Sequence, residues 1–592
     1  MNSRADTRGR IPIIVITLTG CASLAFHTLA QSAQRLDLPA QCSAMAELMA
    51  NHWPDASTHL VSAQWQIAST APLRGPPGAP AATIDVPAHC ELIGVAQERV
   101  GEAGQHYAIH FHLRLPEAWN GRFLFEGGGG SDGLIGDALG VYSAAAQPAL
   151  AQGFAVLSQD AGHDNSINND AARGGVLVFG FDEQARANYG HASLPIVSRA
   201  AKAAIHQFYG AAPHRSYFVG CSKGGAEGMA LAQRYPEEFD GIVANAPAIS
   251  LPRAGIAEAW DTQAMASAVP EPAGTEVPFA KLSQSFSDAD FLLVREVVLA
   301  TCDADDGLKD GVIEDFSHCT TARVAPQLEA RQCQDEKSAG CLSAAQIAAL
   351  LRVMHGPHDS AGHPLYSDWP WDTGVGSVGW RIWKIGAYEG MPPSLNVVLG
   401  GASLSSDFTT PPTPLGANPD SLFGFLMHFD FDRDAPKIYA TNALFARSAW
   451  EDISARSTDL LGFRQRHGKM IVVQGASDPV FSINDTLAWW REVDQKTHAG
   501  ASQFVRVFPV PGMTHCGGGD ATDQFDALRP LMQWVEEGHA PGTIPATTTP
   551  GVPGLQRSRP LCPYPAFARY EGTGDPLSAG SFSCQRPSKG PA

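Results

Sequence analysis

Residues 216–235 read SYFVGCSKGGAEGMALAQRY, and this stretch decides the fold. Its first four residues have the apolar content of a buried strand, and residues 226–235 have the composition of a helix that ends before Pro236. Between them, Gly220-Cys-Ser-Lys-Gly224 has the pattern Gly-x-Ser-x-Gly. Between a strand and a helix, that pattern is typical of a sharp turn that exposes a nucleophilic serine. Ser222 is therefore the candidate nucleophile.

Strands and helices alternate on both sides of this turn. The apolar patterns predict two strands within 91–115, further strands at 121–126, 153–158 and 241–245, and a helix at 193–209. Such alternation predicts a largely parallel sheet with helices on both faces. Together with the serine turn, it predicts an α/β-hydrolase fold.

The alternation stops at about Leu251 and resumes with an apolar strand that begins at Lys469. Residues 251–448 look helical or irregular, so we expect an inserted lid over the active site. This divides the chain into a signal at 1–30, a catalytic domain at 31–250 and 449–592, and the lid between the two parts. The Pro- and Gly-rich tail, 543–592, contains two cysteines, and we expect it to be packed against the domain.

The charge and the first residues restrict the partners and the location of the protein. The chain has 592 residues and a net charge of −19, which argues against a nucleic-acid partner. Arginines in the first ten residues and an apolar run at 11–18 are typical of an export signal. Cleavage near Ala30 predicts a secreted or periplasmic protein. Alternatively, Leu18-Thr-Gly-Cys21 is a lipobox, and a lipid on Cys21 would anchor the protein to the outer membrane. The residues do not indicate an oligomeric state.

The cysteine count agrees with export. Eleven cysteines less Cys21 leave ten, an even number suited to disulfides in an oxidising compartment. Proximity suggests Cys42–Cys90, Cys302–Cys319, Cys333–Cys341 and Cys562–Cys584, which leaves Cys221 and Cys516. Connectivity does not follow from sequence alone, so the long-range Cys221–Cys516 pair is a hypothesis. It would tie Ser222 to the neighbour of Cys516, His515.

A nucleophilic serine needs a general base, and the base needs a carboxylate to orient it. His515 is the candidate base, in a loop that follows a predicted strand. Asp478 is the candidate acid because it directly follows the strand at 470–474, and Asp485 is the alternative. The order Ser, Asp, His is the one expected for this fold.

The developing oxyanion needs two hydrogen-bond donors. The backbone N–H of Lys223, the residue after the nucleophile, is expected to supply one, and the Lys223 side chain is expected to be solvated. The second donor is expected from the glycine run at 127–130, where we favour Gly129 or Gly130 without choosing between them.

Residues 302–319, CDADDGLKDGVIEDFSHC, have four aspartates within eight residues and a cysteine at each end. Carboxylate-rich loops of this kind suit a hard cation with oxygen ligands, above all calcium. The spacing is not that of an EF-hand. The loop therefore predicts a structural calcium site in the lid.

Taken together, these motifs resemble the tannase and feruloyl esterase family, which also includes mono(2-hydroxyethyl) terephthalate hydrolase. The likeness covers nearly the whole mature chain and includes the motifs at 220–225 and 512–519, the acidic loop and the tail at 564–584. It implies a triad of Ser222, Asp478 and His515, and the Cys221–Cys516 bridge. It also implies a calcium ligand set made of the Asp303, Asp306 and Asp310 side chains with the Leu308 and Val312 carbonyls. Lys223 departs from the small residue that many members have after the serine.

The resemblance predicts a serine carboxylesterase that acts on small esters of aromatic acids such as ferulates or gallates. The aromatic residues that could sandwich the acyl group are Trp380, Trp383, Phe423, Phe425 and Phe429. No arginine lies between Ile382 and Asp432, although Arg381 and Arg433 flank this stretch, so a free carboxylate on the substrate is disfavoured. The alternatives are a hydrolase of terephthalate monoesters, a peptidase, and a non-catalytic binding protein stabilised by calcium.

Overall fold

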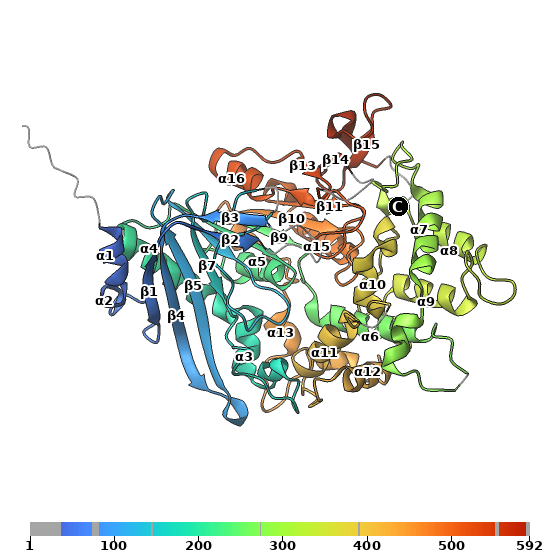
Figure 1. Cartoon of the computed structure of the whole chain (residues 1–592), viewed down its shortest axis with the longest axis horizontal. Helices are drawn as coiled ribbons and strands as arrows, with labels where there is room; N and C mark the ends of the chain where they lie inside the picture. Colours follow the sequence, from blue (N-terminus) through green and yellow to red (C-terminus); the bar gives the residue numbers. More distant parts are fainter. Residues whose placement is uncertain are drawn as a thin grey trace, which may run out of the picture. The chain divides into compact units, whose positions relative to one another are not determined.

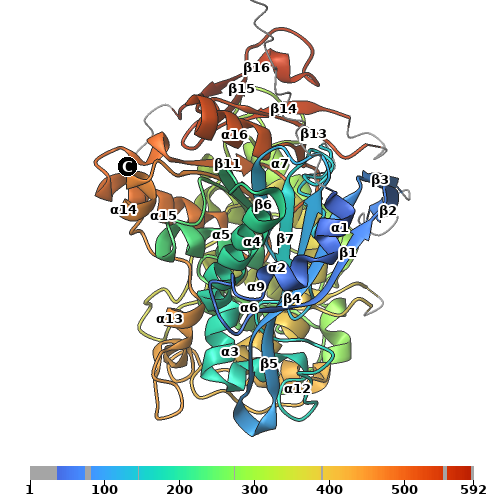
Figure 2. The same ribbon diagram turned by 90° about the vertical axis from the view of Figure 1, so that its left-hand side faces the viewer.

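A mixed nine-stranded sheet forms the centre of the chain, in the order β1-β4-β5-β7-β6-β8-β9-β10-β11 (Figure 1). The strands from β7 to β11 in this order run parallel, whereas β1, β4 and β5 pair antiparallel with their neighbours. Their bounds are β1 His59–Gln66, β4 His89–Val100, β5 His106–Pro116, β6 Arg122–Glu126, β7 Ala155–Gln159, β8 Arg215–Cys221, β9 Gly241–Asn245, β10 Lys469–Gly475 and β11 Val505–Val510. Figure 2 brings the β1 edge of the sheet toward the reader.

The computed structural model describes residues 37–73, 82–143, 146–272, 274–388, 391–550 and 556–587. The predicted export signal and Cys21 lie outside the described residues. Among the described helices, none is both long and apolar enough to cross a membrane.

Successive residues of the central strands face opposite sides of the sheet. Phe218 of β8 belongs to the cluster that contains α4 and α5, whereas its neighbours Tyr217 and Val219 belong to the cluster that contains α16. Strand β10 divides its residues in the same way. Because both faces are covered, these strands read as continuous apolar runs in the sequence. Each fully buried large side chain contributes about 1.5–3 kcal/mol of hydrophobic stabilisation.

Most of the helices outside the insertion pack against this sheet or its edges. The helices outside the insertion are α1 Leu38–Ser43, α2 Met45–Met49, α3 Glu183–Ala187, α4 Ser193–Tyr209, α5 Lys223–Arg234, α14 Leu461–Gln465, α15 Ile483–Lys496 and α16 Leu528–Glu537. The predicted helix at 193–209 is confirmed as α4. Helix α5 begins at Lys223 rather than at Ala226, because Gly224 and Gly225 continue the helix. A Cβ on Gly224 would lie 2.5 Å from the Gly128 carbonyl oxygen, so glycine is used here for close approach and not to end a helix.

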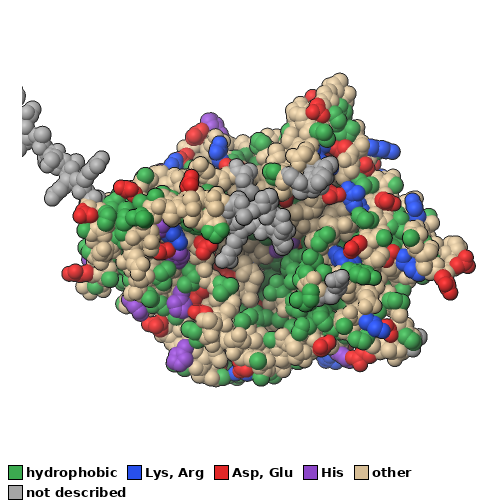
Figure 3. Space-filling model, viewed as in Figure 1, with side chains coloured by type: hydrophobic (Ala, Val, Ile, Leu, Met, Phe, Trp, Pro, Cys, Tyr) green, Lys and Arg blue, Asp and Glu red, His purple; other side chains and the backbone are tan. Residues whose placement is uncertain are grey.

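The chain between β9 and β10 is helical, as predicted, and its described residues add no strand to the central sheet. Figure 1 shows these helices, green to orange, beside the sheet. They are α6 Leu251–Ala266, α7 Asp288–Cys302, α8 Thr321–Glu329, α9 Ala344–His355, α10 Val378–Ile385, α11 Ala402–Ser406, α12 Pro419–Met427 and α13 Ala449–Ile453. Capping boxes at Ser287 and Ser343 fix the starts of α7 and α9. Figure 3 shows a hollow near the middle of this face, bordered on one side by hydrophobic side chains.

The tail is packed, as expected from its composition. It contributes to a small sheet and a hairpin, β13 Ile544–Thr547 with β14 Ser558–Leu561, and β15 Phe567–Tyr570 with β16 Phe582–Gln585. The remaining strands are β2 Ser69–Leu73, β3 Ala82–Val86 and β12 Gln524–Phe525. Arg559 of β14 is buried and pairs with Asp310 of the acidic loop. The tail therefore joins the insertion to the sheet domain.

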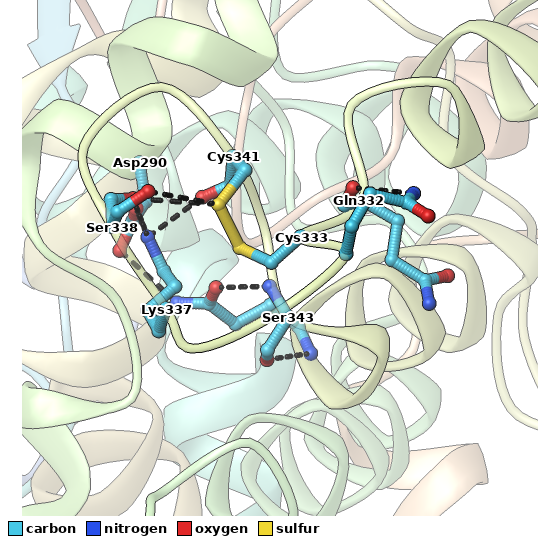
Figure 4. The surroundings of a disulfide bond; sticks show 9 residues. Asp290, Gln332, Cys333, Lys337, Ser338, Cys341 and Ser343 are labelled. Carbon is cyan, nitrogen blue, oxygen red and sulfur yellow. Dashed lines mark hydrogen bonds and ion pairs between the residues drawn. A yellow bond between two sulfur atoms is a disulfide. The ribbon is translucent and has the colours of Figure 1, made fainter.

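All five predicted disulfides are present: Cys42–Cys90, Cys221–Cys516, Cys302–Cys319, Cys333–Cys341 and Cys562–Cys584. Figure 4 shows the Cys333–Cys341 bridge, which closes a short loop. Lys337 in this loop donates to the Cys341 carbonyl oxygen (2.7 Å) and pairs with Asp290 of α7 (2.6 Å), so the loop is anchored to that helix.

Candidate active site

Ser222 occupies the sharp turn between β8 and α5. Its backbone has φ 62° and ψ −124°, a left-handed conformation that costs a non-glycine residue about 1–3 kcal/mol. Two hydrogen bonds to the end of β9 and the residues after it hold the turn: the Ser222 N–H donates to the Asn245 carbonyl oxygen (3.1 Å), and the Ser222 carbonyl oxygen accepts from the Ala248 N–H (3.2 Å). These hydrogen bonds therefore hold Ser222 in this strained conformation.

His515 and Asp478 meet at the carboxyl ends of β11 and β10. The two atoms His515 Nδ1 and Asp478 Oδ2 lie 2.9 Å apart. The other Asp478 oxygen accepts the N–H groups of Val480 and Phe481, at 3.0 and 3.1 Å, and Asp478 is only 2% exposed. The alternative acid, Asp485, pairs instead with Arg456 at 3.0 Å. Of the two candidates, Asp478 is the one that contacts the histidine.

The Cys221–Cys516 disulfide joins the two loops directly, with Cα atoms 6.1 Å apart. Each cysteine is adjacent to one candidate residue, Ser222 or His515. Closing a loop of this length contributes up to about 5 kcal/mol on the chain-entropy view, less where other bridges already restrict the chain. Locally, the bridge confines the serine turn and the histidine loop to the same place.

The glycine run after β6 faces the serine turn. The Gly127 N–H donates to the Val219 carbonyl oxygen (2.8 Å) and the Gly128 N–H to Glu227 Oε2 (3.0 Å), so both donors are used within the protein. The Gly130 carbonyl oxygen accepts from the Tyr189 hydroxyl (3.0 Å). Of the two glycines favoured from the sequence, Gly130 lines a cavity together with Ser222, and Gly129 is not among its lining residues.

This cavity lies beside the serine and is partly open, so that its roughly 400 Å³ of empty space includes part of the surrounding solvent. It is lined by Gly130, Tyr189, Ser222, Lys223, Leu251, Glu258, Trp383, Leu399, Gly400, Ser403, Phe408, Val480 and Phe481. Two of these residues also flank the histidine, since the rings of Trp383 and Phe481 meet the His515 ring edge-on at 5.4 and 5.2 Å. An apolar cavity with a few polar groups is the usual form of a small-molecule site.

A family model described as tannase and feruloyl esterase matches residues 90–585. The chain belongs to this family. The predicted membership is therefore confirmed, and the protein is a member of a family of carboxylic ester hydrolases.

Curated relatives align with most of the chain. It is 43% identical over 553 residues to mono(2-hydroxyethyl) terephthalate hydrolase from Piscinibacter sakaiensis, covering 90% of each protein. It is 29% identical over 531 residues to a probable feruloyl esterase from Arthroderma benhamiae, covering 87% of this chain and 88% of the relative.

Solved structures confirm the predicted fold. Feruloyl esterase B from Aspergillus oryzae superposes with a TM-score of 0.70 at 22% identity, covering 93% of this chain and 100% of the other. Tannin acyl hydrolase from Aspergillus niger gives a TM-score of 0.64 at 20% identity, covering 92% and 95%.

One expectation for this family member is wrong: the Lys223 side chain is not solvated but only 3% exposed. Its Nζ lies 2.6 Å from Glu227 Oε1 and 3.5 Å from Asp132 Oδ2, and it sits 4.7 Å above the Tyr189 ring. Burial alone would lower the pKa of this amine, but the carboxylates of Asp132 and Glu227 outweigh burial and raise it above its ordinary value. Lys223 is therefore a buried cation held by two acids.

The buried Lys223 is also connected to the glycine run, through Glu227. Glu227, its partner one helical turn along α5, uses its second oxygen to accept the Gly128 N–H at 3.0 Å. The cation, the helix and the glycine run are thus one hydrogen-bonded unit. The spacing of Lys223 and Glu227 was a readable signal for a helical ion pair, but Asp132 comes from a distant loop.

Asp372 of the insertion is a positioning residue that sequence reasoning missed. Its Oδ2 accepts from the Ser477 hydroxyl and from the Gly512 N–H, both at 2.6 Å. Ser477 precedes Asp478, and Gly512 belongs to the histidine loop. The carboxylate therefore joins the two loops that carry the His–Asp pair. An isolated aspartate between Trp371 and Thr373 gives no pattern by which to find it.

Most of the predicted aromatic residues pack elsewhere. Of the five, only Trp383 lines the cavity. Trp380 packs against Phe291, Phe423 against Phe279, and Phe425 against Phe429. The cavity instead takes Phe408 and Phe481, which sequence reasoning missed because one comes from an irregular loop and the other from the segment after Asp478.

The flanking arginines are engaged in the protein. Arg381 is buried and donates to the carbonyl oxygens of Phe286 and Ser283, both at 2.7 Å. Arg433 is exposed and pairs with Asp434 at 2.8 Å. Neither lines the cavity beside Ser222.

The acidic loop folds around its aspartates. Asp303 accepts from the Gly311 N–H, Asp306 from the Leu308 N–H and Asp310 from the Val312 N–H, each at 3.1 Å. Burial raises the pKa of Asp306 to about 7, and the nearby charges of Asp310 and Asp303 add to this shift. The oxygen-rich donors match a hard cation. However, the described residues contain no converging group of three or more acidic, histidine or cysteine side chains, so calcium stays a prediction.

Proposed function

We propose that this protein hydrolyses esters of hydroxycinnamic or gallic acids through an acyl-enzyme on Ser222. The observation that carries the proposal is the meeting of the serine turn and the His515–Asp478 pair beside one cavity with aromatic walls. Aromatic side chains stack well on a planar acyl group, and Trp383, Phe408 and Phe481 supply such surfaces.

In the first step, Ser222 Oγ attacks the ester carbonyl carbon while His515 Nε2 accepts the serine proton. Asp478 at Nδ1 holds the imidazole in the required tautomer and stabilises the imidazolium. The backbone N–H groups of Lys223 and Gly130 then stabilise the oxyanion. The alcohol leaves with the proton from His515, and a water molecule, activated by the same imidazole, releases the acid.

The polarity of the cavity bears on the choice of acid. No arginine lines it, and its one lysine, Lys223, is already neutralised by two carboxylates. A carboxylate on the substrate would therefore find no free cation among the lining residues. This favours phenolic acyl groups.

A second candidate is the hydrolysis of terephthalate monoesters. It is supported by the 43% identity to mono(2-hydroxyethyl) terephthalate hydrolase over 90% of both chains.

The test is hydrolysis of methyl ferulate, propyl gallate and mono(2-hydroxyethyl) terephthalate by the purified exported protein. We expect turnover of the first two to exceed that of the third. In Ser222→Ala, kcat should fall by at least about 10⁴-fold. If the terephthalate monoester is the best substrate, the second candidate replaces the first. If none of the esters is cleaved by folded protein, aromatic ester hydrolysis is wrong.

We also propose that the protein is exported, either secreted or periplasmic, or held at the outer membrane by a lipid on Cys21. Five disulfides are typical of an oxidising compartment. We further propose that calcium binds the acidic loop through Asp303, Asp306 and Asp310 with the carbonyls of Leu308 and Val312. There it would stabilise the insertion and take no part in the chemistry.

A further inference from the structure

Glu258 is a buried acid that faces the candidate active site. It lies on α6, seven residues after Leu251, and this spacing of about two helical turns puts both side chains on one face. Both line the cavity that contains Ser222, and Glu258 is only 5% exposed. The mechanism proposed above does not use it.

The surroundings of Glu258 leave its carboxyl group without a partner. In the described part of the chain, no hydrogen bond or ion pair reaches its carboxyl oxygens. Lys384, the cation whose charge acts on Glu258, pairs instead with Asp261 and donates to the Pro479 carbonyl oxygen (2.6 Å). A Cβ on Gly400 would lie 2.1 Å from Glu258 Oε2, so glycine is needed at that position to leave room for the carboxyl group.

Burying a carboxyl group without a hydrogen-bond partner costs folding free energy, so such groups are rare unless a ligand hydrogen-bonds to them. Burial raises the pKa of Glu258 well above its ordinary value; the charge of Lys384 opposes this shift and that of Asp261 adds to it. The group therefore favours the neutral acid, which has one O–H donor and one carbonyl acceptor. Such a pair of atoms matches a hydroxyl group on a ligand.

The rest of the cavity makes Glu258 the distinctive polar group. Most of the wall around it is apolar, formed by Leu251, Trp383, Leu399, Phe408, Val480 and Phe481. Of the other polar lining residues besides Ser222, Lys223 is paired with Glu227, the Tyr189 hydroxyl donates to the Gly130 carbonyl oxygen, and Ser403 contributes a hydroxyl group, so Glu258 is the one carboxyl group among the described lining residues. The cavity therefore offers an aromatic ring apolar surfaces and, at Glu258, one carboxyl group.

We propose that Glu258 is the specificity-determining residue of the acyl pocket and hydrogen-bonds a ring hydroxyl of the aromatic acid. This inference rests on the proposed ester hydrolysis and narrows it to phenolic acyl groups. A substrate with a carboxylate at the same ring position would meet an acid with no cation free to balance it. The neutral Glu258 therefore favours phenolic esters, whereas the lack of a free cation among the lining residues disfavours terephthalate monoesters.

The experiment compares methyl p-coumarate with methyl cinnamate, which differ only in one ring hydroxyl. We expect the unmodified protein to prefer p-coumarate by about tenfold in kcat/KM, the size of one buried hydrogen bond. In Glu258→Met the preference should fall to about one, through loss on p-coumarate with cinnamate nearly unchanged. Glu258→Gln, which keeps a donor and an acceptor, should retain part of the preference.

Met265→Leu is the matched control, since it changes a buried apolar side chain of the same helix that does not line the cavity, and it should leave the preference intact. Equal losses on both esters in Glu258→Met would overturn the proposal and assign Glu258 a purely structural role. An unchanged preference would overturn it as well. If Glu258→Met does not fold, an unchanged preference in Glu258→Gln has the same meaning. If the unmodified protein cleaves neither ester, the proposed function itself fails.

Discussion

The two walls of the cavity are built in different ways. On the sheet side, Ser222, Gly130 and Val480 belong to loops that follow β8, β6 and β10, and hydrogen bonds to their backbone groups hold them. On the insertion side, Leu251, Glu258 and Phe408 come from α6 and from a loop after α11, and side-chain packing holds them. The first wall is made of short contiguous motifs, and the second of single residues far apart in the sequence.

The two walls also differ in whether their buried ionisable side chains have partners within the protein. On the sheet side, the Lys223 ammonium group is balanced by Glu227 and Asp132. On the insertion side, the Glu258 carboxyl group has no such balance within the described residues. A charged group that is paired within the protein can hold the catalytic residues in position. A polar group without a partner is available to hydrogen-bond the substrate. The sheet wall thus supplies the chemistry and the insertion wall the selectivity.

The largest expected effect comes from the sheet wall, at the acid that contacts His515. Asp478→Asn should lower kcat by about 10³–10⁴-fold, because the amide favours the wrong imidazole tautomer. KM should change little. The measurement is steady-state hydrolysis of the best ester found.

The control for this variant is Asp485→Asn, which removes the carboxylate that pairs with Arg456. It should lower kcat by less than about fivefold, because that pair contributes to stability and not to the reaction. A larger loss in Asp485→Asn than in Asp478→Asn would show that the acid is misassigned.

The sheet wall could be predicted from the sequence because each of its functional residues adjoins a recognisable strand. Ser222, Asp478 and His515 all follow apolar runs, and the cysteines beside two of them indicated the bridge. Strands β1, β4 and β5 extend this sheet antiparallel, which the local patterns of alternating strands and helices did not reveal.

The insertion wall could not be predicted in the same way. Glu258 and Asp372 are single acids in helical or irregular chain, and their importance depends on which residues face them across the fold. The prediction of a solvated Lys223 side chain was wrong for the same reason. Glu227 is one helical turn away, but Asp132 and Tyr189 reach the amine only through tertiary packing.

An intermediate effect on kcat is expected from Lys223, whose partner Glu227 connects helix α5 to the glycine run. Lys223→Met leaves Glu227 and Asp132 buried without a cation, which should cost about 3–5 kcal/mol of unfolding free energy. Because Glu227 also accepts the Gly128 N–H, kcat should fall by about tenfold as the oxyanion donors lose their position. Urea unfolding and kcat are the two measurements.

The double variant Lys223→Met/Glu227→Gln tests the cause. It removes one uncompensated charge and keeps a side-chain oxygen for the Gly128 N–H, so part of both losses should be recovered. Lys437→Met, at a half-exposed pair with Asp434, is the matched control and should cost less than about 1 kcal/mol. If the double variant is no better than Lys223→Met, the link through Glu227 is wrong.

The smallest effect on the reaction is expected from the acidic loop. Removal of calcium with EDTA should lower the melting temperature by a few degrees, since a ligand that binds only the folded state at about 100 times its Kd adds about 2.7 kcal/mol. Scanning calorimetry with and without added calcium measures this shift. Asp306→Asn should abolish the calcium dependence of the melting temperature. A melting temperature of the unmodified protein that changes with neither calcium nor EDTA would contradict the assignment.

The contacts of the loop explain why kcat should then change by no more than about twofold. Asp310 pairs with Arg559 of the tail, so the first structure to loosen is the junction between insertion and tail. The route toward the site is indirect: Arg295 of α7 pairs at 2.5 Å with Asp520, which follows the histidine loop. His515 itself is held by Asp478 and by the disulfide at Cys516, and neither depends on the acidic loop. A kcat that fell as steeply as in Asp478→Asn would mean that the insertion controls the sheet wall after all.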